Sequence, residues 1–365
     1  MKKNKVWEWL GKKKIWLSII GILTLPLIMA ILFAWTAGWI NFGRLTSKQM
    51  FNQFDHAITP FPPGFRRAHG KGICFTGIFH PEIKASKLSK ARVFSQKTVA
   101  VIGRFAIAAG DPHISDKTAK LTSMALLLKT DDNQEWRMAM NSVPFFHVAT
   151  PAGFYDNMVA NRPDPKTGKP DPEKIALFYK KHPETIKFDK WAAQAPWPDS
   201  YSDMEFNGIN AFRFISDDGK SSYVRWCMKP HILRHQLSEK QRSAKDSDFL
   251  SEDLLKRLKS GPLYWDMIVT IANPNDPIND PSQPWPANRK QVKIGTLEIT
   301  GASDQATGPC RDINYDPTIL PTGIEVSDDP VLAARSGVYS HSYNARMHEI
   351  ATGKAPEAVG KKSKK

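Results

Sequence analysis

The stretch RRAHGKGICFTGIF, residues 66–79, decides the fold, because it places a histidine ahead of an alternating apolar segment. The alternation over residues 74–79 predicts a β-strand with two distinct faces. His69 stands at the start of this strand between Ala68 and Gly70, whose small size lets a bulky group approach the backbone. A single histidine near a strand is more often structural than functional, so this stretch alone leaves its role open.

The positive charge of the chain is concentrated at its two ends. The 365 residues carry a formal net charge of +15, and ten lysines within the first 14 and last five residues supply two thirds of it. The remaining sequence has no basic patch interleaved with aromatic residues, so nucleic acid is not an expected partner. A hydrophobic content of 41% and 27 prolines favour a globular, loop-rich protein.

Residues 15–40 contain no charged side chain. As a helix, this run is long enough to cross a bilayer core of roughly 30 Å. Six lysines and only Glu8 precede this run, which predicts an N-terminus inside the cytoplasm. A cleaved signal peptide is the alternative, but its apolar core would be shorter, about 7–15 residues. We therefore expect a cytoplasmic segment over 1–14, a single-pass inner-membrane helix over 15–40, a connector over 41–60 and a periplasmic remainder.

The chain has three cysteines, Cys74, Cys227 and Cys310, so at least one is unpaired within a monomer. The sequence contains no C-x-x-C-H motif and no Cys/His cluster with zinc spacing. Neither covalent haem attachment nor a zinc centre is therefore predicted.

Two segments place polar residues among apolar ones. Residues 98–109, TVAVIGRFAIAA, predict a strand that is apolar on both faces except for Arg104, and a buried arginine is costly unless an anion meets it. Asn141 comes directly before a Pro-aromatic turn.

Further expected elements are a hairpin over 124–140, a helix over 174–195, a hairpin over 206–225, a helix over 251–259 with Ser251 as its N-cap, and a strand over 292–300.

The second informative stretch is RSGVYSHSYNAR, residues 335–346. On a helix Arg335 and Tyr339 are four residues apart, so the guanidinium lies over the phenol oxygen. A nearby cation favours tyrosinate, typically by 1–3 pKa units from a value of about 10. Tyrosinate is one of the axial ligands that hold ferric haem iron. Surface Arg–Tyr pairs are also common, so the spacing alone leaves both interpretations open.

Five segments in colinear order, from about residue 61 to 347, resemble the haem catalase family, and specifically its small catalase-related peroxidases. They are RRAHGKG, VIGRFAIAAGDP, NSVPFFHVATPAGF, FNGINAF and LPTGIEVSDDPVLAARSGVYSHSYNAR. Each fragment is unspecific by itself, but five in the family's order identify the chain as a member. The resemblance implies an α+β fold, a catalase-like closed antiparallel β-barrel with flanking helices over residues 61–351.

The resemblance also implies a haem b cofactor and roles for individual residues. It makes His69 the distal acid/base, Asn141 the distal hydrogen-bond donor, and Tyr339 the proximal iron ligand, supported by Arg335. The chemistry of the first role is plausible on its own, because a histidine can take a proton from one oxygen of a peroxide and return it to the leaving oxygen.

Four further positions match residues that contact haem in the family. Arg66, Arg104 and Arg346 fall where propionates bind, which supplies the anion that a buried Arg104 needs. Phe154 falls where a ring packs against the distal haem face.

Three positions depart from the family's pattern. The family's serine two residues after the arginine, which orients the distal histidine, is Ala106 here. The valine before the histidine is Ala68, and a channel aspartate is Leu121. These changes predict a wider pocket, a less tightly aimed histidine and weak disproportionation of hydrogen peroxide.

The leading prediction is therefore a haem peroxidase that reduces hydrogen peroxide or organic peroxides at the expense of an unidentified organic donor. The alternatives are hydrogen peroxide disproportionation, rearrangement of fatty-acid hydroperoxides and, outside enzymes, a haem-binding sensor or carrier. The oligomeric state is open between a monomer and a homo-oligomer. We expect the basic tail over 352–365 to be disordered.

Overall fold

The computed structural model describes residues 3–37, 39–40, 45–58, 60–118, 120–233 and 235–355, in two compact units over 1–49 and 50–365. The first unit contains helix α1 (Lys3–Thr36). Among the described residues, none of the helices combines the length and the apolar character that a bilayer span requires, and the spanning helix predicted over 15–40 is not confirmed. Most of the tail predicted to be disordered, from residue 356 onward, lies outside the described residues.

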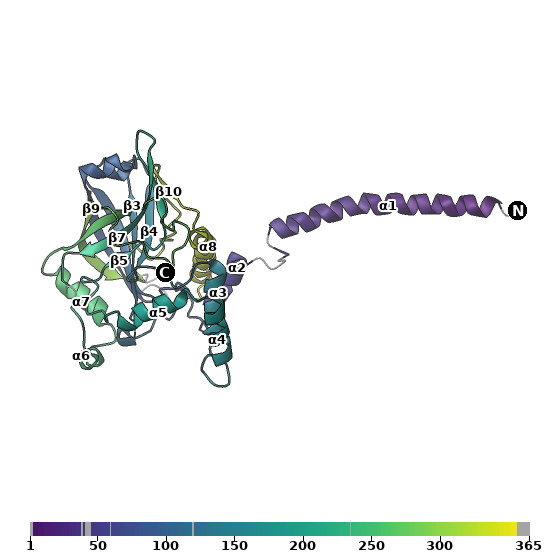
Figure 1. The fold of residues 1–365 in the computed structure, drawn as a ribbon. Helices are drawn as coiled ribbons and strands as arrows, with labels where there is room; N and C mark the ends of the chain where they lie inside the picture. Colours follow the sequence, from purple (N-terminus) through teal and green to yellow (C-terminus); the bar gives the residue numbers. More distant parts are fainter. Residues whose placement is uncertain are drawn as a thin grey trace, which may run out of the picture. The chain divides into compact units, whose positions relative to one another are not determined.

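Within the described part of the second unit, eight antiparallel strands close a barrel (Figure 1). In ring order they are β1 (Gly72–Pro81), β2 (Val99–Ile107), β3 (Thr122–Lys129), β4 (Glu135–Asn141), β5 (Phe206–Asn207), β7 (Ser221–Pro230), β8 (Leu263–Ile271) and β9 (Gln291–Asp304). Strand β9 pairs with β1, which closes the ring, while β6 (Phe212–Ile215) and β10 (Ile324–Val326) extend the sheet from β7. The closed antiparallel barrel predicted from the resemblance is confirmed.

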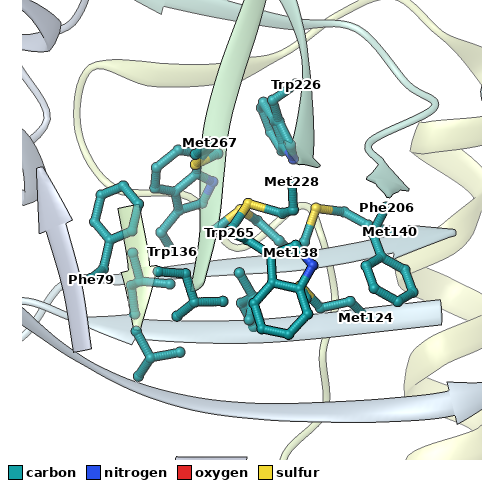
Figure 2. Close-up of a cluster of buried hydrophobic side chains, with 14 of the residues drawn as sticks. Phe79, Met124, Trp136, Met138, Met140, Phe206, Trp226, Met228, Trp265 and Met267 are labelled. Carbon is teal, nitrogen blue, oxygen red and sulfur yellow. The ribbon is translucent and has the colours of Figure 1, made fainter. Parts of the chain in front are cut away.

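The barrel interior is filled by aromatic rings and methionines, as Figure 2 shows for Trp136, Trp226 and Trp265. Methionine suits the gaps between such rings, because its unbranched chain adapts to irregular space. Phe79 of β1 faces this core, whereas Cys74 on the opposite face belongs to a separate buried cluster. The alternation in residues 74–79 therefore separates the two faces of β1 as expected.

The helices lie outside the barrel wall, and α8 lies beside α3 in Figure 1. Their bounds are α2 (Ser47–Asp55), α3 (Pro151–Ala160), α4 (Pro172–Lys181), α5 (Thr185–Gln194), α6 (Glu239–Ser243), α7 (Phe249–Leu258) and α8 (Pro330–Ala351), with short 3-10 helices over Ile83–Lys87, Arg92–Phe94 and Asp116–Thr118. The single helix predicted over 174–195 is wrong, because Pro183 separates α4 from α5 and cannot donate a helical hydrogen bond. The N-cap of α7 is Asp248 rather than Ser251.

A disulfide joins Cys74 in β1 to Cys310, in the segment between β9 and β10. Both residues are fully buried, and Cys227 is a buried free thiol. The odd cysteine count therefore leaves one unpaired thiol, as expected. The disulfide fixes the segment after β9 against the outer face of β1.

Candidate functional site

One cavity of about 250 Å³ brings together every residue predicted for the site. Eight of the residues that line it are the predicted ones, namely Arg66, His69, Arg104, Asn141, Phe154, Arg335, Tyr339 and Arg346. They come from the segment before β1, from β2, from the end of β4, from α3 and from α8. Closure of the barrel brings these segments together, although they lie far apart in the chain.

The charge of the cavity wall is strongly positive. Among the described residues that line it are five arginines and no aspartate or glutamate. One of the five, Arg67, is neutralised outside the cavity by Asp55, whose carboxylate lies 2.7 Å from its Nε, and by Glu349. None of the carboxylates in the described part of the chain forms an ion pair with Arg66, Arg104 or Arg346.

Arg104 and Arg346 are buried cations, and Arg66 is half-buried. Nη2 of Arg66 donates only to backbone carbonyls, including that of Cys310 at 2.9 Å. The Nε groups of Arg104 and Arg346 are buried and have no hydrogen-bond partner. Burial, followed by repulsion from Arg346 and Arg104, lowers the pKa of Arg66, and burial lowers the pKa of Arg104 to about 10. The wall is therefore suited to a ligand that brings more than one negative charge.

His69 lies in the wall with a backbone φ of 55°, a left-handed conformation that few residues other than glycine adopt. Its Nδ1 lies 3.0 Å from the hydroxyl oxygen of Ser123. Burial, followed by the charges of Arg104 and Arg335, lowers the pKa of His69 to about 4. The imidazole is therefore neutral at pH 7, and the contact to Nδ1 leaves Nε2 as the nitrogen that can exchange a proton with a ligand.

Ser123 is a residue that the sequence analysis missed. It lies in β3 directly opposite Ala106 in β2, so the neighbouring strand supplies the hydroxyl that position 106 lacks. His69 therefore has a hydroxyl partner although position 106 is alanine, and the expectation that it is less tightly aimed stays a prediction. The register continues to Asn141, which pairs with Ser123 across β3 and β4. Extending the predicted hairpin over 124–140 by one residue at each end would have paired Ser123 with Asn141.

On the opposite wall, Nη2 of Arg335 donates to the hydroxyl oxygen of Tyr339 over 3.0 Å. Nη1 of Arg335 donates to Oδ1 of Asn210 over 2.7 Å, and the Asn210 amide donates to Asp329 over 2.7 Å. Asp329 caps α8 by accepting from the backbone N–H groups of Val331 and Leu332. Burial raises the pKa of Asp329. Asn210 belongs to the FNGINAF segment, but the sequence analysis assigned it no role.

The remaining wall is apolar. Phe154 packs against Phe54 of α2 and Phe146, with ring centroids 5.6 and 5.3 Å away. The contribution of α2 was not predicted. Ala68 lines the cavity, as expected for a position that widens it, whereas Leu121 lies outside the lining. The expected effect of Leu121 on the channel therefore stays a prediction.

The described residues contain no group of three or more His, Cys, Asp or Glu side chains that could hold a bare metal ion. Tyr339 lines the cavity from α8, and its hydroxyl oxygen accepts a hydrogen bond from Arg335.

Comparison with known proteins places this geometry in context. The catalase family model matches residues 45–353. A catalase-related peroxidase of Synechococcus elongatus is 39% identical over 287 residues, which cover 79% of this chain and 85% of that relative. A catalase-related peroxidase of Mycolicibacterium paratuberculosis is 33% identical over 285 residues, which cover 78% of this chain and 90% of that relative.

Solved catalases share the fold at lower identity. A bacterial catalase superposes with a TM-score of 0.70 at 21% identity, over 83% of this chain and 61% of its own. Catalase A from Saccharomyces cerevisiae superposes with a TM-score of 0.69 at 18% identity, over 78% of this chain and 61% of its own. The chain thus spans about 61% of the length of these two catalases.

Proposed function

The chain belongs to the catalase family, and from this premise we propose that it is a haem-dependent peroxidase. In this proposal it reduces hydrogen peroxide or organic peroxides with electrons from an organic donor. The single observation that carries the proposal is the cavity, whose wall combines His69 and Tyr339 with three arginines that have no carboxylate partner.

The donors of the cavity fit a haem group. Haem carries two propionates, and Arg66, Arg104 and Arg346 offer buried positive charge with two unused Nε donors. The Tyr339 hydroxyl offers an oxygen ligand for the iron. Because the sequence has no motif for covalent attachment, we propose non-covalent haem b. When bound, the haem supplies the redox chemistry of its iron.

The chain's own residues have three tasks in this proposal. Arg335 donates a hydrogen bond to the Tyr339 oxygen, which would bind the iron, and so holds that oxygen in place. Nε2 of His69 takes the proton from one peroxide oxygen and returns it to the leaving oxygen, which a neutral imidazole can do. The Asn141 amide donates a hydrogen bond that holds the peroxide in line.

Two observations bear on which reaction prevails. Two facts support oxidation of organic donors: Ala68 lies in the wall, and the two relatives reported above are catalase-related peroxidases. The contact between Ser123 and His69 supports a second candidate, disproportionation of hydrogen peroxide. Weak disproportionation was expected partly because His69 lacks a serine partner at position 106, and Ser123 offers such a partner from β3.

An activity panel on purified, haem-loaded protein separates these functions. We expect oxidation of a dye with hydrogen peroxide and with an alkyl peroxide, and only weak oxygen release from hydrogen peroxide. Oxygen release as vigorous as that of an ordinary catalase would favour disproportionation. Conversion of a fatty-acid hydroperoxide without a donor would favour rearrangement, and haem binding without any turnover would favour a sensor or carrier.

We further propose that the protein works outside the cytoplasm. The run of uncharged residues over 15–40 with six preceding lysines supports export, and so does a disulfide, which persists in oxidising compartments. Attachment to the inner membrane stays a prediction. Reporter fusions at the C-terminus, with fractionation and sequencing of the mature N-terminus, distinguish an anchored chain from an exported soluble chain and from a cytoplasmic one.

A further inference from the structure

Three neighbouring strands each place one residue in a row at the His69 end of the barrel, and two of these residues are polar. Ala106 of β2 lies opposite Ser123 of β3, and Ser123 lies opposite Asn141 of β4. His69 enters this row from the segment before β1, with Nδ1 3.0 Å from Ser123 Oγ. Ser123 is 8% exposed, so its hydroxyl must find its partners inside the protein.

From this geometry we propose that Ser123 is the positioning residue of His69, and that it supplies from β3 the hydroxyl that position 106 of β2 lacks. The inference deepens the proposed function and rests on it, since the orientation of His69 matters to turnover only if this residue exchanges protons with a bound ligand.

The hydroxyl also decides which ring nitrogen carries the proton. A serine hydroxyl has one proton to donate and two lone pairs that accept. Ser123 Oγ lies 3.4 Å from the carbonyl oxygen of Ala106, which can take that proton. A lone pair then accepts the proton on Nδ1 of His69, which leaves Nε2 without a proton and able to act as a base. The opposite arrangement, in which Ser123 donates to Nδ1, would put the proton on Nε2.

The backbone of His69 is held separately from its ring. The N–H of Gly70 donates to the carbonyl of Ala109 over 2.8 Å, and Nη2 of Arg104 donates to the Gly70 carbonyl over 3.1 Å. A Cβ at Gly70 would approach the Gly110 carbonyl oxygen to 2.2 Å, so the segment has no room to shift there. These contacts hold the backbone beside His69, while its ring is in contact with the Ser123 hydroxyl and with the backbone of Ile107.

The test compares Ser123→Ala with the cross-strand exchange Ala106→Ser/Ser123→Ala. The readout is the association rate of cyanide with the ferric haem-loaded protein across pH, because hydrogen cyanide must give up its proton to a base as it binds. We expect Ser123→Ala to slow cyanide association about 10- to 100-fold, the usual cost of a misplaced catalytic group. The exchange variant should recover most of that loss, and haem content and unfolding midpoint should match those of the wild type.

A double-mutant cycle with His69→Ala shows whether Ser123 acts through the histidine. In the His69→Ala background, Ser123→Ala should slow cyanide association no further. An equal loss in both backgrounds, or a wild-type rate in Ser123→Ala, would overturn the inference. The proposed function fails on a different result, namely the absence of peroxide turnover while cyanide association still depends on Ser123.

A second measurement reads the tautomer directly. In protein labelled with ¹⁵N at histidine and free of haem, the ring nitrogen shifts of His69 should show a proton on Nδ1. Ser123→Ala should shift this population toward a proton on Nε2, and Ala106→Ser should restore it. A proton on Nε2 in the wild-type protein would overturn the inference.

Discussion

Arg335 and Tyr339 lie one turn apart on α8, and the guanidinium donates a 3.0 Å hydrogen bond to the phenol oxygen. Nη1 of the same guanidinium donates a hydrogen bond to Asn210. The Asn210 amide donates in turn to Asp329 at the start of the same helix. The capping residue of α8 and the hydroxyl that faces the cavity are therefore connected through one buried chain of polar groups. A buried network of this kind orients each of its members only while all remain paired.

Tyr339→Phe tests the proposed iron ligand. Without the hydroxyl, we expect the loss of tyrosinate charge-transfer absorption and of most bound haem, because Arg335 then has no phenolate to stabilise. Absorption spectra and haem content of the purified variant measure this. Tyr343→Phe is the matched control, since Tyr343 lines the same cavity one turn further along and should be dispensable for these spectra. Unchanged spectra in Tyr339→Phe would contradict the assignment.

Asn210→Ala tests the buried network behind Arg335. Removing the amide takes one hydrogen-bond partner from Asp329 and one from Arg335 in the protein interior, so we expect the free energy of unfolding to fall by about 1–3 kcal/mol. Urea unfolding measures this loss, and a shift of the tyrosinate band reports the freed guanidinium. The exposed Asn161→Ala should cost less than about 0.5 kcal/mol. Equal stability of the two variants would refute a role for Asn210.

Cys74→Ser tests the disulfide, which closes a sequence separation of 236 residues. Loss of so long a constraint should lower the free energy of unfolding by about 2–5 kcal/mol. Haem should also dissociate faster, because the carbonyl of Cys310 is one of the groups that hold Arg66. Unfolding curves and haem transfer to an acceptor protein measure both effects. Cys227→Ser, at the free thiol, should change neither by a comparable amount, and a similar loss there would contradict the prediction.

The pH dependence of stability follows from two buried histidines. The pKa values of His69 and His147 are both lowered to about 4, chiefly by burial, whereas an unfolded chain titrates near 6.5. Between these values the unfolded chain binds more protons, so stability falls as the pH is lowered, by up to about 3 kcal/mol for each histidine.

Urea unfolding of the haem-free protein across about pH 4–7 measures this loss. His69→Gln should flatten part of the dependence and leave the share of His147. An identical slope in wild type and variant would show that His69 does not titrate in this window. The positive charges of Arg66 and Arg104 help to lower the pKa of His69. In the haem-loaded protein, the negative charges of the propionates should offset part of this effect and raise the pKa of His69 toward its ordinary value.

Ala68→Val tests the width of the pocket. The added methyl groups should reduce oxidation of bulky donors several-fold relative to small ones, because Ala68 lines the cavity beside His69. Ratios of kcat/KM for a large and a small dye measure the effect. Leu121→Val is the control, since Leu121 lies outside the lining. An unchanged ratio in Ala68→Val would mean that donors react elsewhere.

Relationships between residues close in the chain could be predicted from the sequence. The alternation over residues 74–79 predicted the two faces of β1, and the spacing of Arg335 and Tyr339 predicted their contact on a helix. Both follow from the fixed geometry of a single strand or helix, which needs no knowledge of the rest of the fold. The eight predicted site residues needed more, because their identification came from the order of five segments that resemble a family.

Only the tertiary structure decided which side chains from distant segments of the chain contact one another. The hydroxyl of Ser123 reaches His69 because of the register between β2 and β3, and a shift by one residue would turn it to the other face. Asn210, which accepts a hydrogen bond from Arg335, and Cys310, which forms the disulfide with Cys74, likewise lie more than a hundred residues from their partners. Such contacts depend on barrel closure and strand register, which are set by many side chains acting together, so no short stretch of sequence contains them.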